Sequence, residues 1–363
     1  MKIRVNREEL IKLLSNLSVV IKENSIKPVI SGTKLEAKNG MAVFTGSNLE
    51  FSFISSIPAQ IENEGVTVFK IPLILEYIKL LEVENLDITV SEGKLLIHRA
   101  EFSIMDWEEY PEIKQPESEN IFEVESQEII SAFEKVKFSA FPTADNLAIN
   151  CIRMACDDNE LNMISTDSYR LTKYFLETPC KSKMEVSIPL ESVNIICKLL
   201  KDSEEKASFG VKNGILTIKK GNSFMSTRLI ELPFPDYKTI FKNMSYTKNI
   251  ELNTADFKGS MKKVLTVAKR NIETKNGAIF EFKGNRLIST VSSGSAKTVQ
   301  KIDTIKEGED FKASLNVKFV YDFISNIQKN ILIKATNSSS MFIMEEAGNK
   351  NYKYILMPLA LRD

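Results

Sequence analysis

Residues 5–14 read VNREELIKLL, and two later stretches of the chain share this layout. They are VESQEIISAF at residues 124–133 and LNTADFKGSM at residues 252–261. Each stretch has an acidic side chain at its fifth position: Glu9, Glu128 and Asp256. Asn6 and Asn253 stand three residues before their acid, as N-cap residues do, and an acid in the first turn suits the positive end of a helix dipole. The pattern predicts three equivalent helix starts.

Two further landmarks recur at nearly the same offsets. Ser47-Asn48 corresponds to Thr166-Asp167, 119 residues later, and residues 289–297 take the equivalent place in the last third. A second helix start carries Pro72, then Pro189, then Asn316. Proline is favoured at the first position of a helix, where its missing N–H costs nothing. All three landmarks recur in the same order and at nearly the same spacing, so we predict three copies of one domain: residues 1–118, 119–243 and 244–363.

Each copy has the same predicted order of helix, strands, helix, strands. Alternating apolar residues mark the strands, and SEG, KNG and KGN at residues 91–93, 212–214 and 220–222 mark hairpin turns. We therefore predict an α+β fold in which each copy packs two helices on antiparallel sheets. The joints between copies are expected near residues 110–120 and 234–249, which hold proline, asparagine and charge.

Composition excludes several classes of protein. The chain has one histidine, His98, in a run that alternates like a strand, so metal sites and histidine-dependent nucleophiles are not expected. It has no apolar run of about 18 residues and no secretory signal, which predicts a cytoplasmic protein without a membrane span. The cysteines show no metal-binding spacing and are expected as reduced thiols: Cys151, Cys156, Cys180 and Cys197.

The net charge of zero is unevenly distributed. The first copy has 13 basic and 18 acidic residues, a net charge of −5, and the second has a net charge of −2. The third copy carries +7. The asymmetry has two interpretations. It is either chance drift in surface charge, or it serves to attract the first copy of one chain to the third copy of another across a subunit contact.

The polar cluster STDSYRL at residues 165–171 could suggest an active site. A hydroxyl nucleophile needs a base held by a third group, but the single histidine lies in another copy and no GxSxG elbow or phosphate loop is present. An enzyme that uses Ser168, Asp167 and Arg170 is therefore the weakest interpretation. Because Thr166-Asp167 has a counterpart in the first copy, we predict that Asp167 shapes a turn between strands, and we predict no catalytic residue, metal or cofactor.

The order and spacing of these features resemble the bacterial DNA polymerase III beta subunit family, the beta sliding clamps. The resemblance runs end to end and is carried by MKIRVNREELIKLL at the N-terminus, STDSYRL at 165–171, LPFPDY at 232–237 and YILMPLAL at 354–361. It implies the DNA clamp fold, in which two chains join head to tail into a ring of six domains. The helices would line the hole and the sheets would form the outer wall.

The resemblance also implies the function and the partners. The chain would be a processivity factor, not an enzyme, that encircles duplex DNA without sequence specificity. It would tether the DNA polymerase III alpha subunit, the clamp loader and other proteins that carry a clamp-binding motif. The alternative is a monomeric repeat scaffold that binds peptides and never encircles DNA.

Site residues follow from the resemblance by position. A peptide-binding pocket would be formed by Ile149, Thr166, Ser168, Tyr169, Arg170, Leu171, Phe319, Ile355, Met357, Pro358 and Leu359. DNA would be contacted by Lys22, Lys27, Lys198, Lys201, Lys263 and Arg270, and the dimer interface would include Phe102 and Ile104. Ser168 and Tyr169 stand where the family commonly has Gly and His, which leaves the preferred peptide sequence open.

Overall fold

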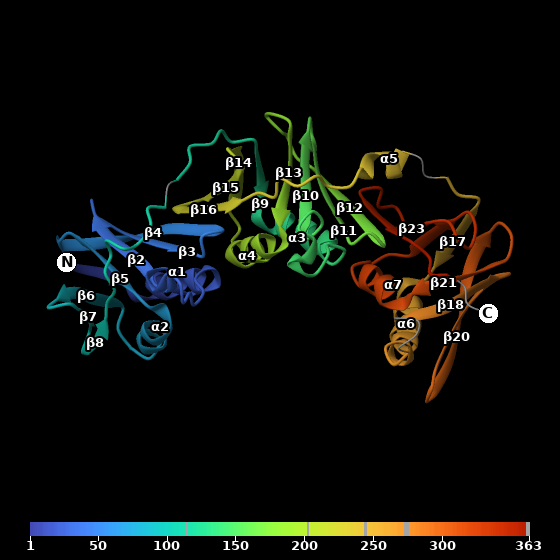
Figure 1. The fold of residues 1–363 in the computed structure, drawn as a ribbon, viewed down its shortest axis with the longest axis horizontal. Coiled ribbons are helices and arrows are strands. Elements are labelled where there is room, and N and C mark those ends of the chain that lie inside the picture. The colour runs from blue at the N-terminus through green and yellow to red at the C-terminus, as the bar shows by residue number, and fades with distance from the viewer. Residues whose placement is uncertain (114, 202, 243–244, 272–275, 361–363) are drawn as a thin grey trace. The chain divides into compact units, whose positions relative to one another are not determined.

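The computed structural model describes residues 1–113, 115–201, 203–242, 245–271 and 276–360 (Figure 1). It forms two compact units. Unit 1 contains residues 1–131, 156–159 and 178–231, and unit 2 contains residues 132–155, 160–177 and 232–363. The middle third of the chain thus contributes to both units, as do α3 (Ser126–Lys137) and β10 (Cys151–Asp157).

Unit 1 is built on one antiparallel sheet with the strand order β8-β7-β6-β1-β4-β16-β15-β14-β9, and β2, β3 and β5 extend it from β4. The helices are α1 (Arg7–Val20), α2 (Ile71–Lys79), α4 (Leu190–Leu200) and the 3-10 turn Pro28–Ser31. The strands are β1 (Lys2–Asn6), β2 (Thr33–Lys38), β3 (Met41–Ser47), β4 (Phe51–Asn63), β5 (Gly65–Phe69), β6 (Asn85–Ser91), β7 (Lys94–Ile97), β8 (Ala100–Ser103), β9 (Phe122–Glu125), β13 (Met184–Pro189), β14 (Lys206–Lys212), β15 (Ile215–Lys220) and β16 (Ser223–Arg228).

Unit 2 has the strand order β10-β11-β12-β24-β23-β22-β17-β20-β19-β18-β21. Its helices are α5 (Tyr237–Lys242), α6 (Thr254–Ala268), α7 (Val317–Ile324) and the 3-10 turn Ala144–Asn146. The strands are β11 (Glu160–Thr166), β12 (Arg170–Glu177), β17 (Lys248–Leu252), β18 (Gly277–Lys283), β19 (Arg286–Ser293), β20 (Ala296–Glu307), β21 (Phe311–Asn316), β22 (Ile331–Ala335), β23 (Phe342–Glu346) and β24 (Tyr352–Leu356). Strands β12 and β24 are neighbours although 182 residues separate their first residues, Arg170 and Tyr352.

The predicted helix starts are confirmed. The side chain of Asn6 accepts a hydrogen bond from the backbone N–H of Glu9, and Asn253 accepts from Asp256 in the same way, at 3.1 Å in both cases. Asn316 caps α7 by accepting from Phe319. A capped first turn satisfies N–H groups that have no partner within the helix.

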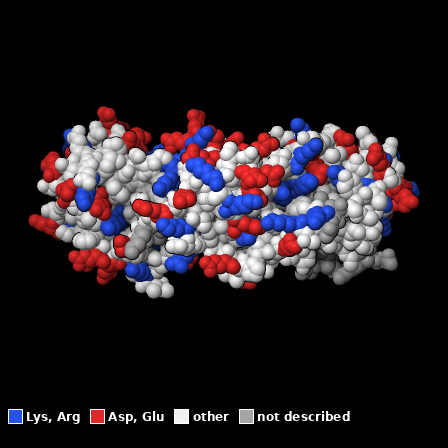
Figure 2. Space-filling view, turned by 90° about the horizontal axis from the view of Figure 1, so that it is seen from above, with Lys and Arg blue, Asp and Glu red and all other residues white. Residues whose placement is uncertain are grey.

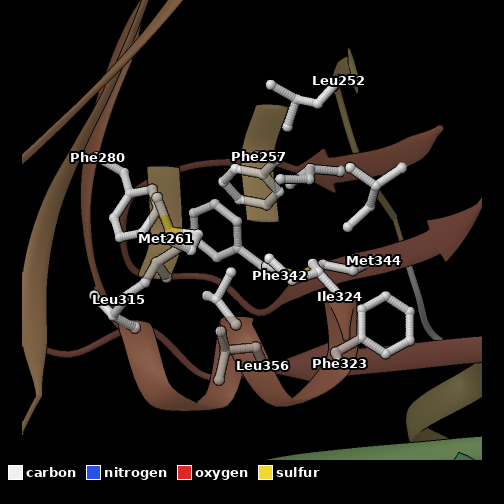
Figure 3. Close-up of a cluster of buried hydrophobic side chains, with 14 of the residues drawn as sticks. Leu252, Phe257, Met261, Phe280, Leu315, Phe323, Ile324, Phe342, Met344 and Leu356 are labelled. Carbon is white, nitrogen blue, oxygen red and sulfur yellow. The ribbon is translucent and has the colours of Figure 1, made fainter. Parts of the chain in front are cut away.

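The core of unit 2 shows why this order of elements folds. Apolar side chains of α6, α7 and the strands around them point toward one another (Figure 3), and residues such as Phe257, Phe280 and Phe323 are fully buried. Each buried side chain of this size contributes about 1.5–3 kcal/mol. The apolar faces of the two helices therefore hold them against the sheet.

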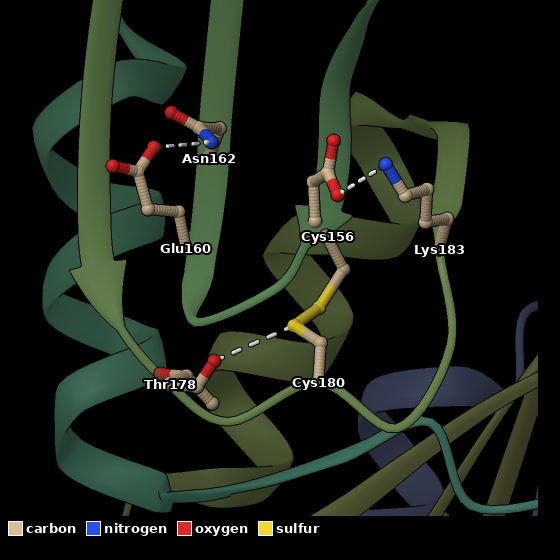
Figure 4. Close-up of a disulfide and its surroundings, with 7 residues drawn as sticks. Cys156, Glu160, Asn162, Thr178, Cys180 and Lys183 are labelled. Atoms are coloured by element: carbon tan, nitrogen blue, oxygen red, sulfur yellow. Dashed lines mark hydrogen bonds and ion pairs between the residues drawn. A yellow bond between two sulfur atoms is a disulfide. The ribbon is translucent and has the colours of Figure 1, made fainter.

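The prediction of four reduced thiols is wrong for two cysteines, because Cys156 and Cys180 form a disulfide (Figure 4). Their Cα atoms lie 6.2 Å apart. The turn after β10 accounts for the approach, since the carbonyl of Asp158 accepts from the N–H of Cys180 at 2.9 Å. The sequence separation of 24 residues gave no sign of this pairing, which depends on the meeting of two strand ends. Cys151 and Cys197 are free and buried.

One local prediction also differs from the structure. His98 lies in the turn between β7 and β8 with φ +55°, and is not a strand residue, because a tight hairpin reverses the chain there. The predicted joint at residues 234–249 contains α5, a short helix. The hairpin turns at residues 92–93, 213–214 and 221–222 are confirmed.

Among the described residues, none of the helices combines the length and the apolar character that crossing a membrane requires. Within the same residues, no three His, Cys, Asp or Glu side chains gather closely enough to hold a metal ion.

Candidate functional site

A tight turn joins β11 to β12 and uses the polar residues of the STDSYRL stretch. Asp167 Oδ1 accepts hydrogen bonds from the backbone N–H groups of Tyr169 and Arg170, both at 3.0 Å. Thr166 Oγ1 donates to the carbonyl of Arg170 at 2.7 Å and accepts from the N–H of Ser168. Ser168 adopts the left-handed φ of +76°. The prediction that Asp167 shapes a turn is confirmed.

Arg170 lies at the centre of a buried polar network. Its Nε donates to Asp167 Oδ2 at 2.9 Å and its Nη1 to Asp322 Oδ2 at 2.8 Å. Its Nη2 donates to the carbonyl of Phe138 at 2.6 Å, and the guanidinium carbon lies 4.0 Å from the centroid of the Phe319 ring. The side chains of Arg170 and Asp167 are each 9% exposed. Arg170 therefore ties β12 to α7 and is held by protein groups on several sides.

The charge of this network is balanced within the protein. Burial disfavours the charged form of Arg170, but Tyr354 and the carboxylates of Asp322 and Asp167 outweigh burial and raise the pKa of the guanidinium. One guanidinium carries a single positive charge and here it faces two carboxylates. Asp322, one of the two, also forms an ion pair with Lys318. The sequence gave no sign of Asp322, which lies 152 residues from Arg170.

An apolar cluster lies beside this network on β11, β12, β24 and α5. The buried side chains of Ile164, Leu171, Tyr237 and Ile355 form it, and we call these four residues the apolar patch. Leu171 is directly opposite Ile355 in the β12–β24 ladder. Residues packed around the patch are Phe234, Ile240, Phe241 and Met341. The sequence prediction included only Leu171 and Ile355 among these residues, although the LPFPDY motif contains Phe234 and Tyr237.

Large apolar side chains at the end of the same ladder are exposed to solvent. Tyr169 is 64% exposed and Met357 is 44% exposed, and the N–H of Met357 donates to the carbonyl of Tyr169 at 2.9 Å. Pro358 and Leu359 are half-buried, and Leu359 bridges to Ser314 of β21. Exposed apolar side chains beside a buried apolar cluster are typical of a surface that receives a partner.

The eleven residues predicted for a peptide pocket all lie in unit 2. Leu171, Ile355, Tyr169 and Met357 lie on the β12–β24 ladder or at its end, as described above. Phe319 is half-buried in α7 under the Arg170 guanidinium, and Ile149 is 3% exposed. Ser168 and Thr166 belong to the turn, so the ladder and the turn bring most of the predicted residues together.

The six predicted DNA-contacting residues have exposed side chains. In unit 1, Lys198 lies on α4, Lys201 follows its last residue, and Lys22 pairs with Glu191 of α4. Lys27 follows α1 in the loop, and in unit 2 Lys263 lies on α6 and Arg270 just after it. On the face drawn in Figure 2, basic and acidic side chains are mixed and neither sign forms one continuous strip.

Phe102 and Ile104 lie on or beside β8, the last strand of the unit 1 sheet. Phe102 lies on this edge strand and Ile104 comes directly after it, and their part in a dimer interface stays a prediction. Both are half-buried, and the Phe102 ring lies 5.6 Å from that of Tyr77 in an edge-to-face arrangement. An edge strand presents unpaired backbone groups that can pair with another chain.

Comparison with known families finds three matching models that together span the chain. They describe the N-terminal, central and C-terminal domains of the DNA polymerase III beta subunit and match residues 1–114, 123–236 and 243–360. A relative from Streptomyces coelicolor named "Beta sliding clamp" is 25% identical, with 99% of this chain and 100% of the relative covered. A Bacillus subtilis relative of the same name is 22% identical, with 99% of both covered.

Solved structures share the fold. The DNA polymerase III subunit beta from Pseudomonas aeruginosa superimposes with a TM-score of 0.94 at 18% identity, over 99% of this chain and all of the other. The beta subunit from Thermotoga maritima gives a TM-score of 0.92 at 22% identity, again over 99% and 100%. The predicted α+β fold of three clamp domains is confirmed.

Proposed function

Because this chain belongs to the DNA polymerase III beta subunit family, we propose that it is a DNA sliding clamp, the processivity factor of a bacterial replicative polymerase. The observation that carries this proposal is the match of three successive family domains along the whole chain. A clamp accelerates replication by keeping the polymerase at a high effective concentration near the primer end. This role requires no catalytic residue, and we propose a non-enzymatic protein of the cytoplasm.

We propose that two copies close head to tail into a ring. Two features support this proposal: β8 is an edge strand that carries the apolar Phe102, and the first and third copies carry net charges of −5 and +7. Opposite charges favour contact between the first copy of one chain and the third copy of the other. Closure would also cover sheet edges that otherwise invite aggregation.

A ring explains how a protein without net charge can stay on DNA. Each phosphate contact adds salt-dependent affinity and resists movement along the duplex. A closed ring is retained by topology and needs few contacts, so a small set of basic side chains suffices. We propose that this set is Lys22, Lys27, Lys198, Lys201, Lys263 and Arg270, which read no base sequence.

We propose that the apolar patch and the exposed residues beside it receive short peptides from the polymerase alpha subunit, the clamp loader and other partners. The residues are those named by sequence, Ile149, Thr166, Ser168, Tyr169, Arg170, Leu171, Phe319, Ile355, Met357, Pro358 and Leu359, together with Ile164 and Tyr237. Exposed Tyr169 and Met357 support the proposal, since aromatic and Met side chains are favoured where several partners bind. The Arg170 network would hold this surface in shape.

Sedimentation of the purified chain tests the ring directly. We expect a particle of twice the 41.1 kDa chain mass, and we expect Phe102→Asp to shift it toward the monomer. Lys212→Gln, on β14 of unit 1, is the matched control and should leave the dimer unchanged. A wild-type monomer at micromolar concentration would contradict the ring and favour a monomeric scaffold that binds peptides.

A further inference from the structure

Two lysines follow the apolar patch along its own strands. Leu171 is opposite Ile355 in the β12–β24 ladder, and two residues further along Lys173 is opposite Lys353. Residues two apart on a strand share a face of the sheet. The apolar pair and the lysine pair therefore lie side by side on one face. Like charges directly opposite each other destabilise a sheet, so this pair carries a cost that a partner of opposite charge would remove.

A third lysine approaches the pair from α5. Lys238 follows Tyr237 of the apolar patch, and the Lys173 Nζ lies 5.8 Å from the ring centroid of Phe241 on the same helix. Burial lowers the pKa of the Lys173 amine, and repulsion from Lys353 and Lys238 adds to this effect, against an opposing attraction to Glu160. We call Lys173 and Lys353 the lysine row. Lys238 acts on Lys173 but also interacts with Asp236, so it is not counted in the row.

One of the nearby carboxylates is already paired with a lysine outside the row. Glu345 is opposite Lys353 on β23, but its Oε2 lies 2.6 Å from the Nζ of Lys334, and both of those side chains are about 15% exposed. Glu160 lies at the start of β11, four residues before Ile164 of the patch. Glu345 is therefore engaged by Lys334, and Glu160 is the carboxylate that attracts Lys173. Lys173 and Lys353 are half-buried, which strengthens their interaction with a bound charge.

We propose that the lysine row binds acidic side chains of a partner peptide whose apolar residues occupy the apolar patch. The inference rests on the proposed peptide site and adds its charge preference: Asp or Glu next to the apolar anchors. The sheet supplies the geometry, because anchors and acids in one extended segment would lie over adjacent rows of one ladder. An acidic peptide fits better than a neutral one because it relieves the repulsion between Lys173 and Lys353.

Two synthetic peptides of equal length test the proposal by fluorescence anisotropy. Both carry the same Leu and Phe anchors, and one has flanking Asp and Glu where the other has Asn and Gln. We expect the wild type to bind the acidic peptide about tenfold more tightly at low salt, and this advantage to shrink as salt rises. In the Lys173→Gln/Lys353→Gln variant the advantage should disappear, while the affinity for the neutral peptide should stay the same.

Controls separate failure of this inference from failure of the peptide site. Lys212→Gln removes a lysine on β14 of unit 1 and should keep the full preference. Leu171→Asp should abolish binding of both peptides. Equal affinity of the wild type for the two peptides would overturn the lysine row alone. Binding of neither peptide, or no effect of Leu171→Asp, would overturn the peptide site and the inference with it.

A second readout follows the amine itself. On binding of the acidic peptide, the pKa of Lys173 should rise, because a nearby carboxylate favours the charged amine, and NMR of the lysine side chains can measure this. The neutral peptide should leave it low or lower it further. A short DNA duplex that displaces the acidic peptide from the wild type but not from the lysine variant would assign the row to phosphate and overturn the proposal.

Discussion

The turn at residues 47–51 of unit 1 and the turn at residues 166–170 of unit 2 share the same hydrogen bonds. Asn48 Oδ1 accepts from two backbone N–H groups, as Asp167 Oδ1 does. In each turn the hydroxyl of the first residue donates to the carbonyl of the fifth. The third residue is left-handed in both, with φ +74° and +76°. The two copies thus keep one backbone turn.

The side chains of the fifth residues differ. Phe51 is an apolar side chain that is 1% exposed, whereas Arg170 is buried among carboxylates and the Phe319 ring in unit 2. The second residue of the turn differs accordingly. Asp167 has a second carboxylate oxygen that pairs with the Arg170 guanidinium, whereas the side chain of Asn48 is uncharged and has only one oxygen. The comparison teaches that one backbone turn can carry different chemistry: Asp167 and Arg170 form a buried ion pair, and the equivalent residues Asn48 and Phe51 cannot.

The corresponding stretch of the last copy no longer has this turn. Residues Gly294 and Ser295 form a two-residue hairpin turn between β19 and β20, where Ser293 Oγ donates to the Ala296 carbonyl at 3.3 Å. The repeat therefore predicts where the chain turns, but the chemistry of each turn belongs to its own copy.

Removal of Arg170 should produce the largest difference between the two turns. Arg170→Ala leaves Asp167 and Asp322 as buried carboxylates without their main partner, and we expect it to cost about 3–5 kcal/mol of unfolding free energy. Chemical denaturation with a probe in unit 2 measures this. Arg228→Ala, an exposed arginine at the end of β16, is the control and should cost less than about 0.5 kcal/mol. Similar small costs for both variants would contradict the network.

Substitutions at the second position separate the turn from the ion pair. Asn48→Ala removes acceptors for two backbone N–H groups, and we expect a cost of about 1–2 kcal/mol. Asp167→Ala removes the same acceptors and the ion pair, so it should cost about 1–2 kcal/mol more. Asp167→Asn keeps the turn and loses only the charge, so it should cost about 1–2 kcal/mol, less than Asp167→Ala. If Asp167→Ala costs no more than Asn48→Ala, the two turns do not differ as described.

Glycine at the third position should affect both turns slightly and equally. Ser168 and Leu49 have left-handed backbone angles, which are strained for residues other than glycine, so glycine removes this strain. Glycine also loses more chain entropy on folding, which offsets part of the gain. We expect Ser168→Gly and Leu49→Gly each to stabilise by about 0.5–1 kcal/mol. Thermal unfolding of the two variants checks this, and destabilisation by either would show that its side chain makes contacts that matter.

The sequence predicted the features that repeat. Caps at Asn6 and Asn253, the hairpin turns and the role of Asp167 all depend on residues within a few positions of one another, and local physics determines them. The two helices and antiparallel strands of each copy followed from periodicity for the same reason. The domain boundaries at residues 118 and 243 stay predictions.

Features that depend on distant residues could not be predicted. The disulfide, the pairing of Arg170 with Asp322 and the packing of α5 on the apolar patch arise only when strands far apart in the chain lie together. The same holds for the lysine row, because Lys173 and Lys353 become neighbours only through the β12–β24 ladder. Pattern in one stretch of sequence carries no information about such partners.

The most direct test of the sliding clamp is its retention on closed circular DNA compared with the same DNA after linearisation, once a clamp loader has placed it there. Topological linkage predicts that the protein stays on the circle and runs off the free ends of the linear form. Equal loss from both forms, or equal retention on both, would contradict a closed ring and show that contacts alone govern binding.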